Sequence, residues 1–307
     1  MRIVFMGTPD FAVPSLQACL ELGEVVAVVT QPDRPRGRGQ EVSASPVKAL
    51  AVARGLAVLQ PEKLKTPPFA EVLAAYRPEV AVVTAYGRLL PREVLAVPTH
   101  GCVNVHASLL PRFRGAAPIQ WALASGDART GVCLMEMDAG MDTGAIIDRE
   151  VLDILPTDTS ATLHLKLAAL GGEVLRRSLQ PYLRGERRAV PQPAEGVVLA
   201  PPIQKEAGQL DFARPAVELE RRLRAFTPWP GSAFRTGSGL LKVHGATVRD
   251  GIGAPGTVLS AGEAGIEVAC GEGSLLLTAL QPEGKRVMSA REFLAGRTVP
   301  VGARWPV

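Results

Sequence analysis

Asparagine is almost absent from this chain, because Asn104 is the only one among 307 residues. Chains adapted to heat tend to lose this chemically labile residue, so a single survivor suggests that its amide does something that Gln or Ser cannot do. The alternative is a turn or capping role, which asparagine often has. The choice between the two roles depends on the residues around Asn104.

Long apolar runs and paired cysteines are also absent. No stretch of 18 or more apolar residues occurs, and the sequence begins with a strand-like run, RIVFMG, instead of a signal-type segment. The four cysteines are scattered and form no C-x-x-C pair. We therefore expect a cytoplasmic protein with free thiols, no disulfide, no metal site and no membrane partner.

The usual nucleotide-binding motifs are missing where they would be expected. The first strand is followed by MGTPDFAVPSL, which is not the G-x-G-x-x-G fingerprint, and no Walker-A sequence occurs. This disfavours a nicotinamide dehydrogenase. An open α/β sheet still binds its ligand at the carboxyl ends of its strands, so the search for a site moves to those ends.

Short β-branched runs alternate with helical patterns through the first 185 residues. Runs that are apolar throughout suit parallel strands buried on both faces. The pattern predicts an α/β fold with a doubly wound, mostly parallel, Rossmann-like sheet. Strands are expected at 2–7, 25–30, 56–60, 79–85, 102–107, 131–138 and 144–154, and helices at 12–22, 46–54, 67–76 and 159–184.

The chain changes character after residue 185. Residues 186–206 are rich in Pro and Gly and are interpreted as a linker, although GVVLA (196–200) could pair locally as an edge strand. One helical pattern (215–226) then precedes short strands separated by Gly-rich turns, which predicts a small OB-like β-barrel. The predicted domains are 1–185, catalytic, and 207–307, joined by the linker.

Three polar residues near predicted strand ends suggest acyl-transfer chemistry. Asn104 and His106 are two apart on one strand and share a face, and Asp142 lies in a Gly-flanked loop after another strand. An amide, an imidazole and a carboxylate can stabilise an oxyanion and move a proton. No G-x-S-x-G motif surrounds Ser108, so we expect direct transfer without an acyl-enzyme.

Motifs spread over essentially the full chain resemble those of the methionyl-tRNA formyltransferases, a formyl-folate-dependent family. They are QPDRPRGRG with SPVKALA, TAYGRLLP, NVHASLLPRFRGAAP, MDAGMDTG and RAFTPWPGSAF. The Asn, His and Asp motifs are shared by other enzymes that use 10-formyltetrahydrofolate, so they specify the formyl donor better than the acceptor. The arginine-rich loop at 33–39, here called the basic loop, and the appended barrel narrow the acceptor to tRNA.

The resemblance implies formyl transfer from 10-formyltetrahydrofolate to the methionine amine of initiator Met-tRNA. Asn104 and His106 would stabilise the oxyanion, and Asp142 would orient His106 and assist proton removal. By the same resemblance, folate would contact Tyr86, Gly87, Leu89, Leu90, Pro91, Ser108, Leu109, Leu110 and Pro111. The acceptor arm of the tRNA would contact Arg34, Arg36, Arg38 and Lys205.

Other functions remain open from the sequence. The nearest is a formyl-folate enzyme that acts on a small amine such as a sugar nucleotide, which would need neither barrel nor basic loop. A non-catalytic RNA-binding module would be expected to carry surface aromatics for stacking. Residues 207–307 hold 12 Lys and Arg against 9 Asp and Glu, a modest basic excess that favours an RNA partner. We expect a monomer.

Overall fold

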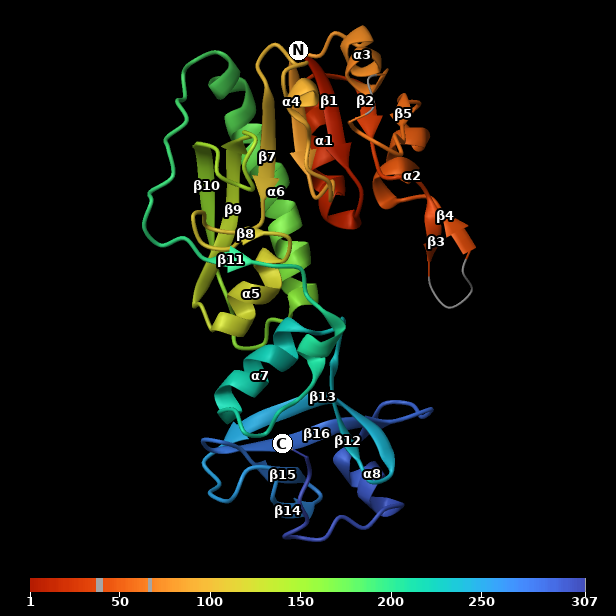
Figure 1. Ribbon diagram of the computed structural model, residues 1–307, viewed down its shortest axis with the longest axis vertical. Coiled ribbons are helices and arrows are strands. Elements are labelled where there is room, and N and C mark those ends of the chain that lie inside the picture. Colours follow the sequence, from red (N-terminus) through yellow and green to blue (C-terminus); the bar gives the residue numbers. More distant parts are fainter. Residues whose placement is uncertain (37–40, 66–67, 307) are drawn as a thin grey trace. The chain divides into compact units, whose positions relative to one another are not determined.

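The computed structural model describes residues 1–36, 41–65 and 68–306, which form two compact units (Figure 1). Unit 1 comprises 1–118, 129–153 and 164–201, within the described ranges. Unit 2 comprises 119–128, 154–163 and 202–307. Two short segments from inside the predicted catalytic domain therefore belong to unit 2, and the predicted boundaries at 185 and 207 stay a prediction.

Unit 1 is built on a seven-stranded sheet in the order β10-β9-β7-β6-β1-β2-β5. Five neighbouring strands, β5, β2, β1, β6 and β7, are parallel, and β9 and β10 are antiparallel. The strand order reverses next to β1, as expected of a doubly wound sheet. The strands are β1 Arg2–Gly7, β2 Glu24–Val29, β5 Val58–Leu59, β6 Val80–Thr84, β7 Cys102–His106, β9 Arg129–Glu136 and β10 Ile146–Asp153.

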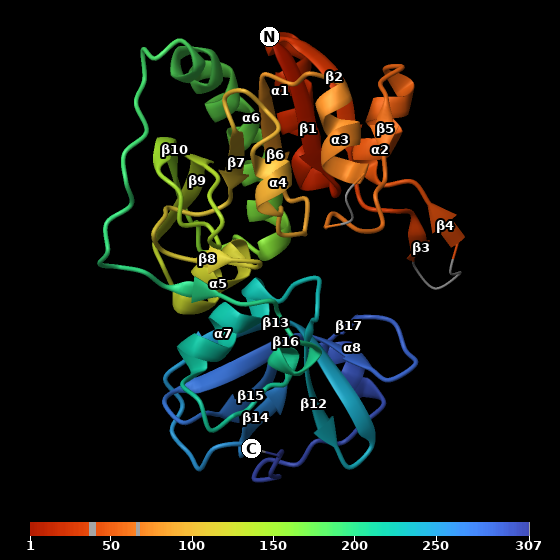
Figure 2. The ribbon, with the colours of Figure 1, turned by 45° about the horizontal axis from the view of Figure 1, so that its top comes forward.

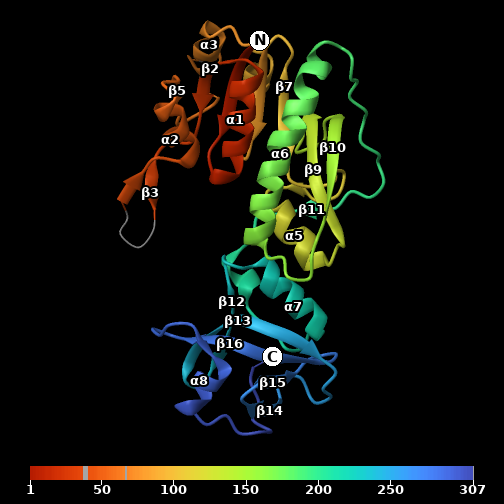
Figure 3. The ribbon, with the colours of Figure 1, turned by 180° about the vertical axis from the view of Figure 1, so that it is seen from behind.

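Helices cover both faces of this sheet. One face packs on α3 and α4 (Figure 2), and α1 and α6 lie on the other (Figure 3). Alternate residues of β1 follow this division, since Val4 and Met6 share a core cluster with Phe69 and Leu73 of α3. The helices are α1 Val13–Leu22, α2 Pro46–Ala53, α3 Pro68–Ala75, α4 Arg92–Leu95, α5 Pro118–Ser125 and α6 Ser160–Leu183, with the short 3-10 helix η1 Asp10–Ala12 before α1.

Local sequence explains where these helices begin. The Ser45 side chain accepts a hydrogen bond from the backbone N–H of Lys48 at 3.1 Å, and Pro46 occupies the first turn of α2. Pro14 takes the same early position in α1. The predicted α/β class and mostly parallel sheet are confirmed.

Two small ribbons complete unit 1. β3 Arg34–Arg36 and β4 Glu41–Ser43 pair antiparallel, and β8 Arg114–Gly115 pairs in parallel with β11 Leu199–Ala200. The second ribbon brings residues predicted as linker onto the segment that follows β7. The possible edge strand at 196–200 is thus present as β11.

Unit 2 is built on an antiparallel sheet in the order β12-β13-β16-β15-β14, with β17 paired to β16. Its core gathers apolar residues of the sheet around Phe212, Leu219 and Phe293. The strands β12 Ser232–Thr236 and β17 Met288–Ser289 and the helix α8 Ala290–Ala295 were not predicted from the sequence. The remaining elements are η2 Lys205–Gly208, α7 Ala216–Ala225, β13 Gly239–Arg249, β14 Val258–Gly262, β15 Gly265–Ala269 and β16 Ser274–Pro282.

In the ranges that the structure describes, no helix combines the length and the apolar character needed to cross a membrane.

Candidate active site

The central strand β7 presents two of the predicted catalytic side chains. Asn104 and His106 alternate with the buried Val103 and Val105, and β7 lies between β6 and β9 in the sheet. His106 is only 6% exposed. Residues i and i+2 of a strand face the same side, so the amide and the imidazole are presented together.

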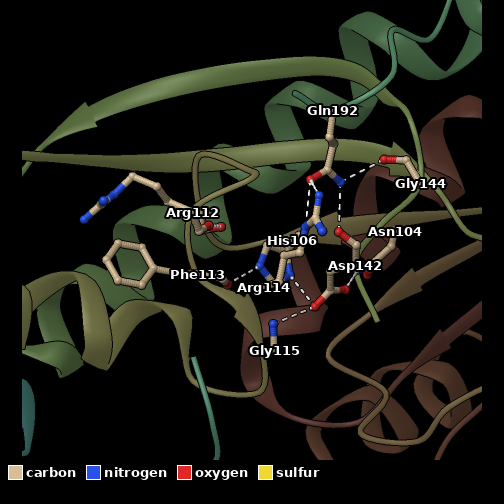
Figure 4. Close-up of polar contacts among 10 residues, drawn as sticks. Asn104, His106, Arg112, Phe113, Arg114, Gly115, Asp142, Gly144 and Gln192 are labelled. Carbon is tan, nitrogen blue, oxygen red and sulfur yellow. Dashed lines mark hydrogen bonds and ion pairs between the residues drawn. The ribbon is translucent and has the colours of Figure 1, made fainter. Parts of the chain in front are cut away.

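Asp142 reaches this pair from the loop between β9 and β10. Because β9 runs antiparallel to β7, this loop begins beside Cys102, whose carbonyl oxygen accepts a 2.8 Å hydrogen bond from the N–H of Met137. The loop then brings the Asp142 carboxylate to both side chains of β7. The structure thus unites three residues separated by up to 38 positions (Figure 4).

The carboxylate of Asp142 is the centre of the cluster. Asn104 Nδ2 lies 3.4 Å from Oδ1, a long hydrogen bond, and the backbone N–H of Gly115 donates to Oδ2 at 2.8 Å. His106 Nδ1 lies 3.6 Å from Oδ2, which is too far for a normal hydrogen bond. The Asp142 side chain is 17% exposed, so it is partly accessible to solvent.

The other nitrogen of the His106 ring has a partner that fixes its protonation. Nε2 lies 3.0 Å from the carbonyl oxygen of Phe113, and a carbonyl oxygen can only accept. Nε2 therefore carries a hydrogen, and the neutral ring has its lone pair on Nδ1, towards Asp142. This ring orientation leaves Nδ1 and Asn104 Nδ2 as the side-chain nitrogen atoms of the cluster that face the carboxylate, beside the backbone N–H of Gly115.

Both main-chain segments around the cluster hold a residue in the left-handed conformation. Phe113 has φ 60° and Asp142 has φ 55°. Such backbone angles cost a non-glycine residue on the order of 1–3 kcal/mol and persist only where the surroundings enforce them. Strain of this kind concentrates at functional sites, and here both strained residues contact His106.

The residues expected at folate lie on two segments, 86–91 after β6 and 108–111 after β7, and these two strands are neighbours in the sheet. In 86–91, the carbonyl oxygen of Tyr86 accepts hydrogen bonds from Gln31 Nε2 at 2.8 Å and Thr8 Oγ1 at 3.4 Å, while Leu89 is 75% exposed. The Tyr86 ring is buried, which raises the pKa of its hydroxyl, and this hydroxyl has no hydrogen-bond partner within the described ranges. Gly87 has φ +78° and Leu90 is buried, whereas Pro91 precedes α4.

The segment 108–111 is more enclosed. Ser108 is fully buried and its hydroxyl donates to the carbonyl oxygen of Arg112 at 2.7 Å, so its hydroxyl serves the loop and is not presented as a nucleophile. Leu110 is 2% exposed, and Leu109 and Pro111 are half-buried. Of this segment, Leu109 and Pro111 are the residues with surface left to meet a ligand.

The residues expected at tRNA are only partly described. Arg34 is exposed on β3. The backbone of Arg36 pairs with Glu41, but its side chain lies outside the described part of the structure, as does all of Arg38. Lys205 is exposed at the start of η2 in unit 2.

Sequence reasoning missed the main-chain partners of the cluster. The carbonyl group of Phe113 binds His106 and the N–H group of Gly115 binds Asp142. Both are backbone groups, which every residue type carries, so the sequence does not single them out. The Gly115 position also needs a glycine, because its φ is +125° and an added Cβ would lie 2.6 Å from the carbonyl oxygen of Ala200. Among the described residues no group of His, Cys, Asp and Glu could hold a metal ion.

Comparison with protein families gives two matches. The model described as "Formyl transferase" matches residues 1–179, and "Formyl transferase, C-terminal domain" matches residues 202–298. The chain is 67% identical over 303 residues to the methionyl-tRNA formyltransferase of Myxococcus xanthus strain DK1622, covering 99% of this chain and 97% of that one. It is 52% identical over 307 residues to the enzyme of that name from Stenotrophomonas maltophilia strain K279a, covering 99% and 100%.

Solved structures share the fold at low identity. The sugar 3N-formyl transferase WlaRD, solved with dTDP and 5-N-formyl-THF, matches with TM-score 0.69 and 18% identity, over 93% of this chain and 99% of that one. HypX from Aquifex aeolicus, solved in complex with tetrahydrofolic acid, matches with TM-score 0.59 and 19% identity, over 96% of this chain and 47% of that one. Both matches extend over most of this chain.

Proposed function

The chain belongs to the formyl transferase family, and we propose that it transfers the formyl group of 10-formyltetrahydrofolate to the α-amino group of methionine on initiator Met-tRNA. The observation that carries this proposal is the 67% identity, over 99% of this chain, with an enzyme named methionyl-tRNA formyltransferase. The product, N-formylmethionyl-tRNA, is the form used in translation initiation.

The chemistry needs one nucleophilic attack and the net movement of one proton from the attacking amine to N10 of the folate. The methionine amine attacks the formyl carbon with its lone pair, and the formyl oxygen becomes an oxyanion. The intermediate collapses, the bond to N10 of the folate breaks, and N10 takes up a proton. Preorganised donors at the oxyanion and a positioned base for the amine proton are the groups that accelerate such a reaction.

The Asp142 cluster offers these groups. Asn104 Nδ2 has a second hydrogen to donate to the oxyanion. Because Nε2 of His106 is held by Phe113, His106 can donate to the oxyanion only from Nδ1, as an imidazolium. Asp142 accepts the proton released by the attacking amine, directly or through a water molecule, and its backbone partner Gly115 keeps the carboxylate aimed at the cluster.

Folate recognition is proposed for the two segments 86–91 and 108–111. A pteridine ring needs an apolar surface and backbone groups for its polar edge. Leu89 and Leu109 supply apolar surface, and Gly87, which has no side chain, is exposed. Each of these segments follows a central strand, β6 or β7, where an open α/β sheet binds its ligand.

Binding of the tRNA acceptor arm is proposed for Arg34, Arg36, Arg38 and Lys205. Three arginines that alternate with Pro and Gly cannot pack into a core and gain most by meeting phosphate. Residues 207–307 would contact the tRNA further from its aminoacylated end, and residues 1–185 would carry the chemistry. We propose that the protein acts in the cytoplasm as a monomer.

The decisive experiment measures formyl transfer from 10-formyltetrahydrofolate to three acceptors: initiator Met-tRNA, free methionine and a dTDP-linked amino sugar. We expect transfer to Met-tRNA only. Transfer to the amino sugar without transfer to Met-tRNA would replace the proposed acceptor with a small amine. No transfer to any acceptor, from a protein that binds folate, would contradict the enzymatic proposal itself.

A further inference from the structure

One side chain outside the predicted site, that of Gln192, forms hydrogen bonds with both of the loops that surround the Asp142 carboxylate. Gln192 Oε1 accepts two hydrogen bonds from Arg114, from Nε at 3.0 Å and Nη2 at 2.7 Å. Gln192 Nε2 donates to the carbonyl oxygens of Asp142 and Gly144, each at 2.8 Å. Figure 4 shows this amide between the two loops, 113–115 on one side and 142–144 on the other.

The chemistry of these contacts requires a primary amide. Its oxygen has two acceptor positions and its nitrogen two hydrogens, and all four are used. The opposite orientation of the amide would point its oxygen at two carbonyl oxygens and its NH₂ at a guanidinium, so the assignment is fixed by the partners. A carboxylate of the same size could keep Arg114 but would lose both donors.

The backbone on both sides of Gln192 is restricted in conformation. Pro191 and Pro193 flank it, and proline fixes its own φ and restricts the residue before it to extended conformations. Two residues before Gln192, Val190 exchanges two backbone hydrogen bonds with Ile146, at 2.8 and 2.9 Å. Further along, Leu199 and Ala200 pair with Arg114 and Gly115. The segment is therefore held at one end by the first residue of β10 and at the other by Arg114 and Gly115.

The two loops are those that carry the backbone strain. Asp142, whose own carbonyl Gln192 binds, and Phe113, the neighbour of Arg114, are both left-handed. Phe113 holds Nε2 of His106, and Gly115, on the other side of Arg114, holds the carboxylate of Asp142. Loss of the Gln192 amide would remove four hydrogen bonds from the structure that keeps the carboxylate and the imidazole in register.

We infer that Gln192 is a positioning residue for formyl transfer: its amide fixes the loop of Asp142 relative to the loop of Phe113, so that Asp142 and His106 meet the reacting groups together. This inference rests on the proposed function for its kinetic consequences. It predicts an effect on turnover, because misplacement of reacting groups by about 1 Å costs on the order of 10²-fold in rate.

The test compares Gln192→Ala and Gln192→Glu with wild type, and uses Gln180→Ala as the matched control. Gln180 is a half-buried glutamine of α6 in the same unit, and its Nε2 donates to the carbonyl oxygen of Leu22. We expect both Gln192 variants to lower kcat by about 10- to 100-fold, with KM for folate and for Met-tRNA within about twofold. Gln180→Ala should keep kcat.

A double-mutant cycle distinguishes positioning from general destabilisation. In the background of Asp142→Asn, whose side chain is no longer a base, Gln192→Ala should lower kcat by less than about twofold, because no carboxylate remains to be positioned. Equal factors in both backgrounds, or wild-type kcat in both Gln192 variants, would overturn the inference.

A readout that needs no activity separates this inference from the proposed function. In protein labelled with ¹⁵N-histidine, Gln192→Ala should shift the ring resonances of His106, assigned by their loss in His106→Gln, and leave those of the other three histidines in place. If wild type does not formylate Met-tRNA, the proposed function fails and this spectrum still tests the inference. An unchanged His106 resonance in Gln192→Ala would reject it.

Discussion

The backbone N–H of Gly115 donates to Asp142 Oδ2 at 2.8 Å, and this bond aims the carboxylate of the candidate site. It also makes the two carboxylate oxygens unequal, because Oδ1 is left to Asn104 and Oδ2 is shared with the face of His106. The main chain at Gly115 thus fixes one oxygen of the carboxylate, while the Gln192 amide holds the loop that carries Asp142. Glycine is needed at 115 because its φ is +125° and a Cβ there would meet the carbonyl oxygen of Ala200.

The three side chains of the cluster should each matter for turnover. We expect Asn104→Ala, His106→Ala and Asp142→Ala each to lower kcat/KM for Met-tRNA by at least about 10²-fold, the scale for loss of one oxyanion donor or one general base. Folate binding by calorimetry and the melting temperature serve as controls for folding. Near wild-type turnover of Asn104→Ala would mean that the single asparagine is structural.

The basic loop should determine tRNA affinity and its salt dependence. Replacing its three arginines with alanine should raise KM for Met-tRNA by about 10-fold or more at moderate salt and leave KM for folate within about twofold, because phosphate contacts release counterions. The matched control replaces three exposed arginines of unit 1 outside the loop, Arg54, Arg77 and Arg188. Parallel changes in both constants, or a tRNA affinity insensitive to salt, would exclude the loop as a tRNA contact.

The folate donor should bind to a fragment that ends at residue 206. The Asp142 cluster and both proposed folate segments lie in unit 1, but residues 154–163 belong to unit 2, where Ser160 donates to the carbonyl oxygen of Thr227. We expect binding with a folate Kd within about threefold of the full chain, because the proposed folate contacts are retained, and a lower melting temperature, because the contacts of 154–163 are lost. Absence of binding by a fragment with native circular dichroism would contradict the proposed placement.

The cysteines should be unreactive in the native protein. All four are buried, and burial raises the pKa of Cys133 and of Cys270 to about 11 and that of Cys102 to about 12. Only the thiolate attacks a disulfide reagent, so at pH 8 a thiol with a pKa near 11 is about 0.1% reactive. Ellman's reagent should give almost no colour until denaturant is added, when four thiols should react. Rapid reaction of the native chain would contradict the burial.

Asp148 should stabilise unit 1 at neutral pH and lose that effect in acid. Although partial burial raises its pKa, hydrogen bonds from Arg177, Ser178 and the backbone N–H of Arg149 outweigh this and hold the pKa below its usual value. A lowered folded-state pKa adds stability above the unfolded pKa of about 3.9, and this stability is lost as pH falls through the lower folded value.

We therefore expect Asp148→Asn to reduce the free energy of unfolding at pH 7 by about 1 kcal/mol, a modest figure because Arg177 is 44% exposed and solvent screens the pair. The difference between the two proteins should shrink as the pH falls below about 4. Urea titrations at pH 7 and pH 3 measure it. A difference that grows in acid would contradict the direction of the pKa shift.

The sequence predicted the elements whose pattern is local. β1 and β6 are continuous apolar runs, and β7 carries Asn104 and His106 at the spacing that places them on one face. β12 was missed because SAFRT is short and combines apolar and polar residues without a clear period, and its place depends on pairing with β13. The sequence also could not show that β9 reverses direction, since strand direction depends on packing.

In the candidate site, too, the parts that depend on residue type could be predicted and the parts that depend on folding could not. Its side chains could be predicted from residue type, but their partners Phe113, Gly115 and Gln192 could not. The first two act through main-chain atoms, and Gln192 lies in a Pro-rich segment whose composition indicates a linker. Hydrogen bonds between residues 50 or 78 positions apart leave no trace in local composition.

The pairing of β11 with β8 affects the order in which the parts of unit 1 can form during synthesis of the chain. Synthesis proceeds from the amino end, so every strand of the seven-stranded sheet is complete long before residues 190–200 have been added. The segment 190–200, which carries Gln192 and β11 and joins the loops around Asp142 and Phe113, is at the end of the part of unit 1 that is translated last. A nascent chain can therefore complete its sheet before Gln192 has formed the hydrogen bonds that join the two loops of the candidate site.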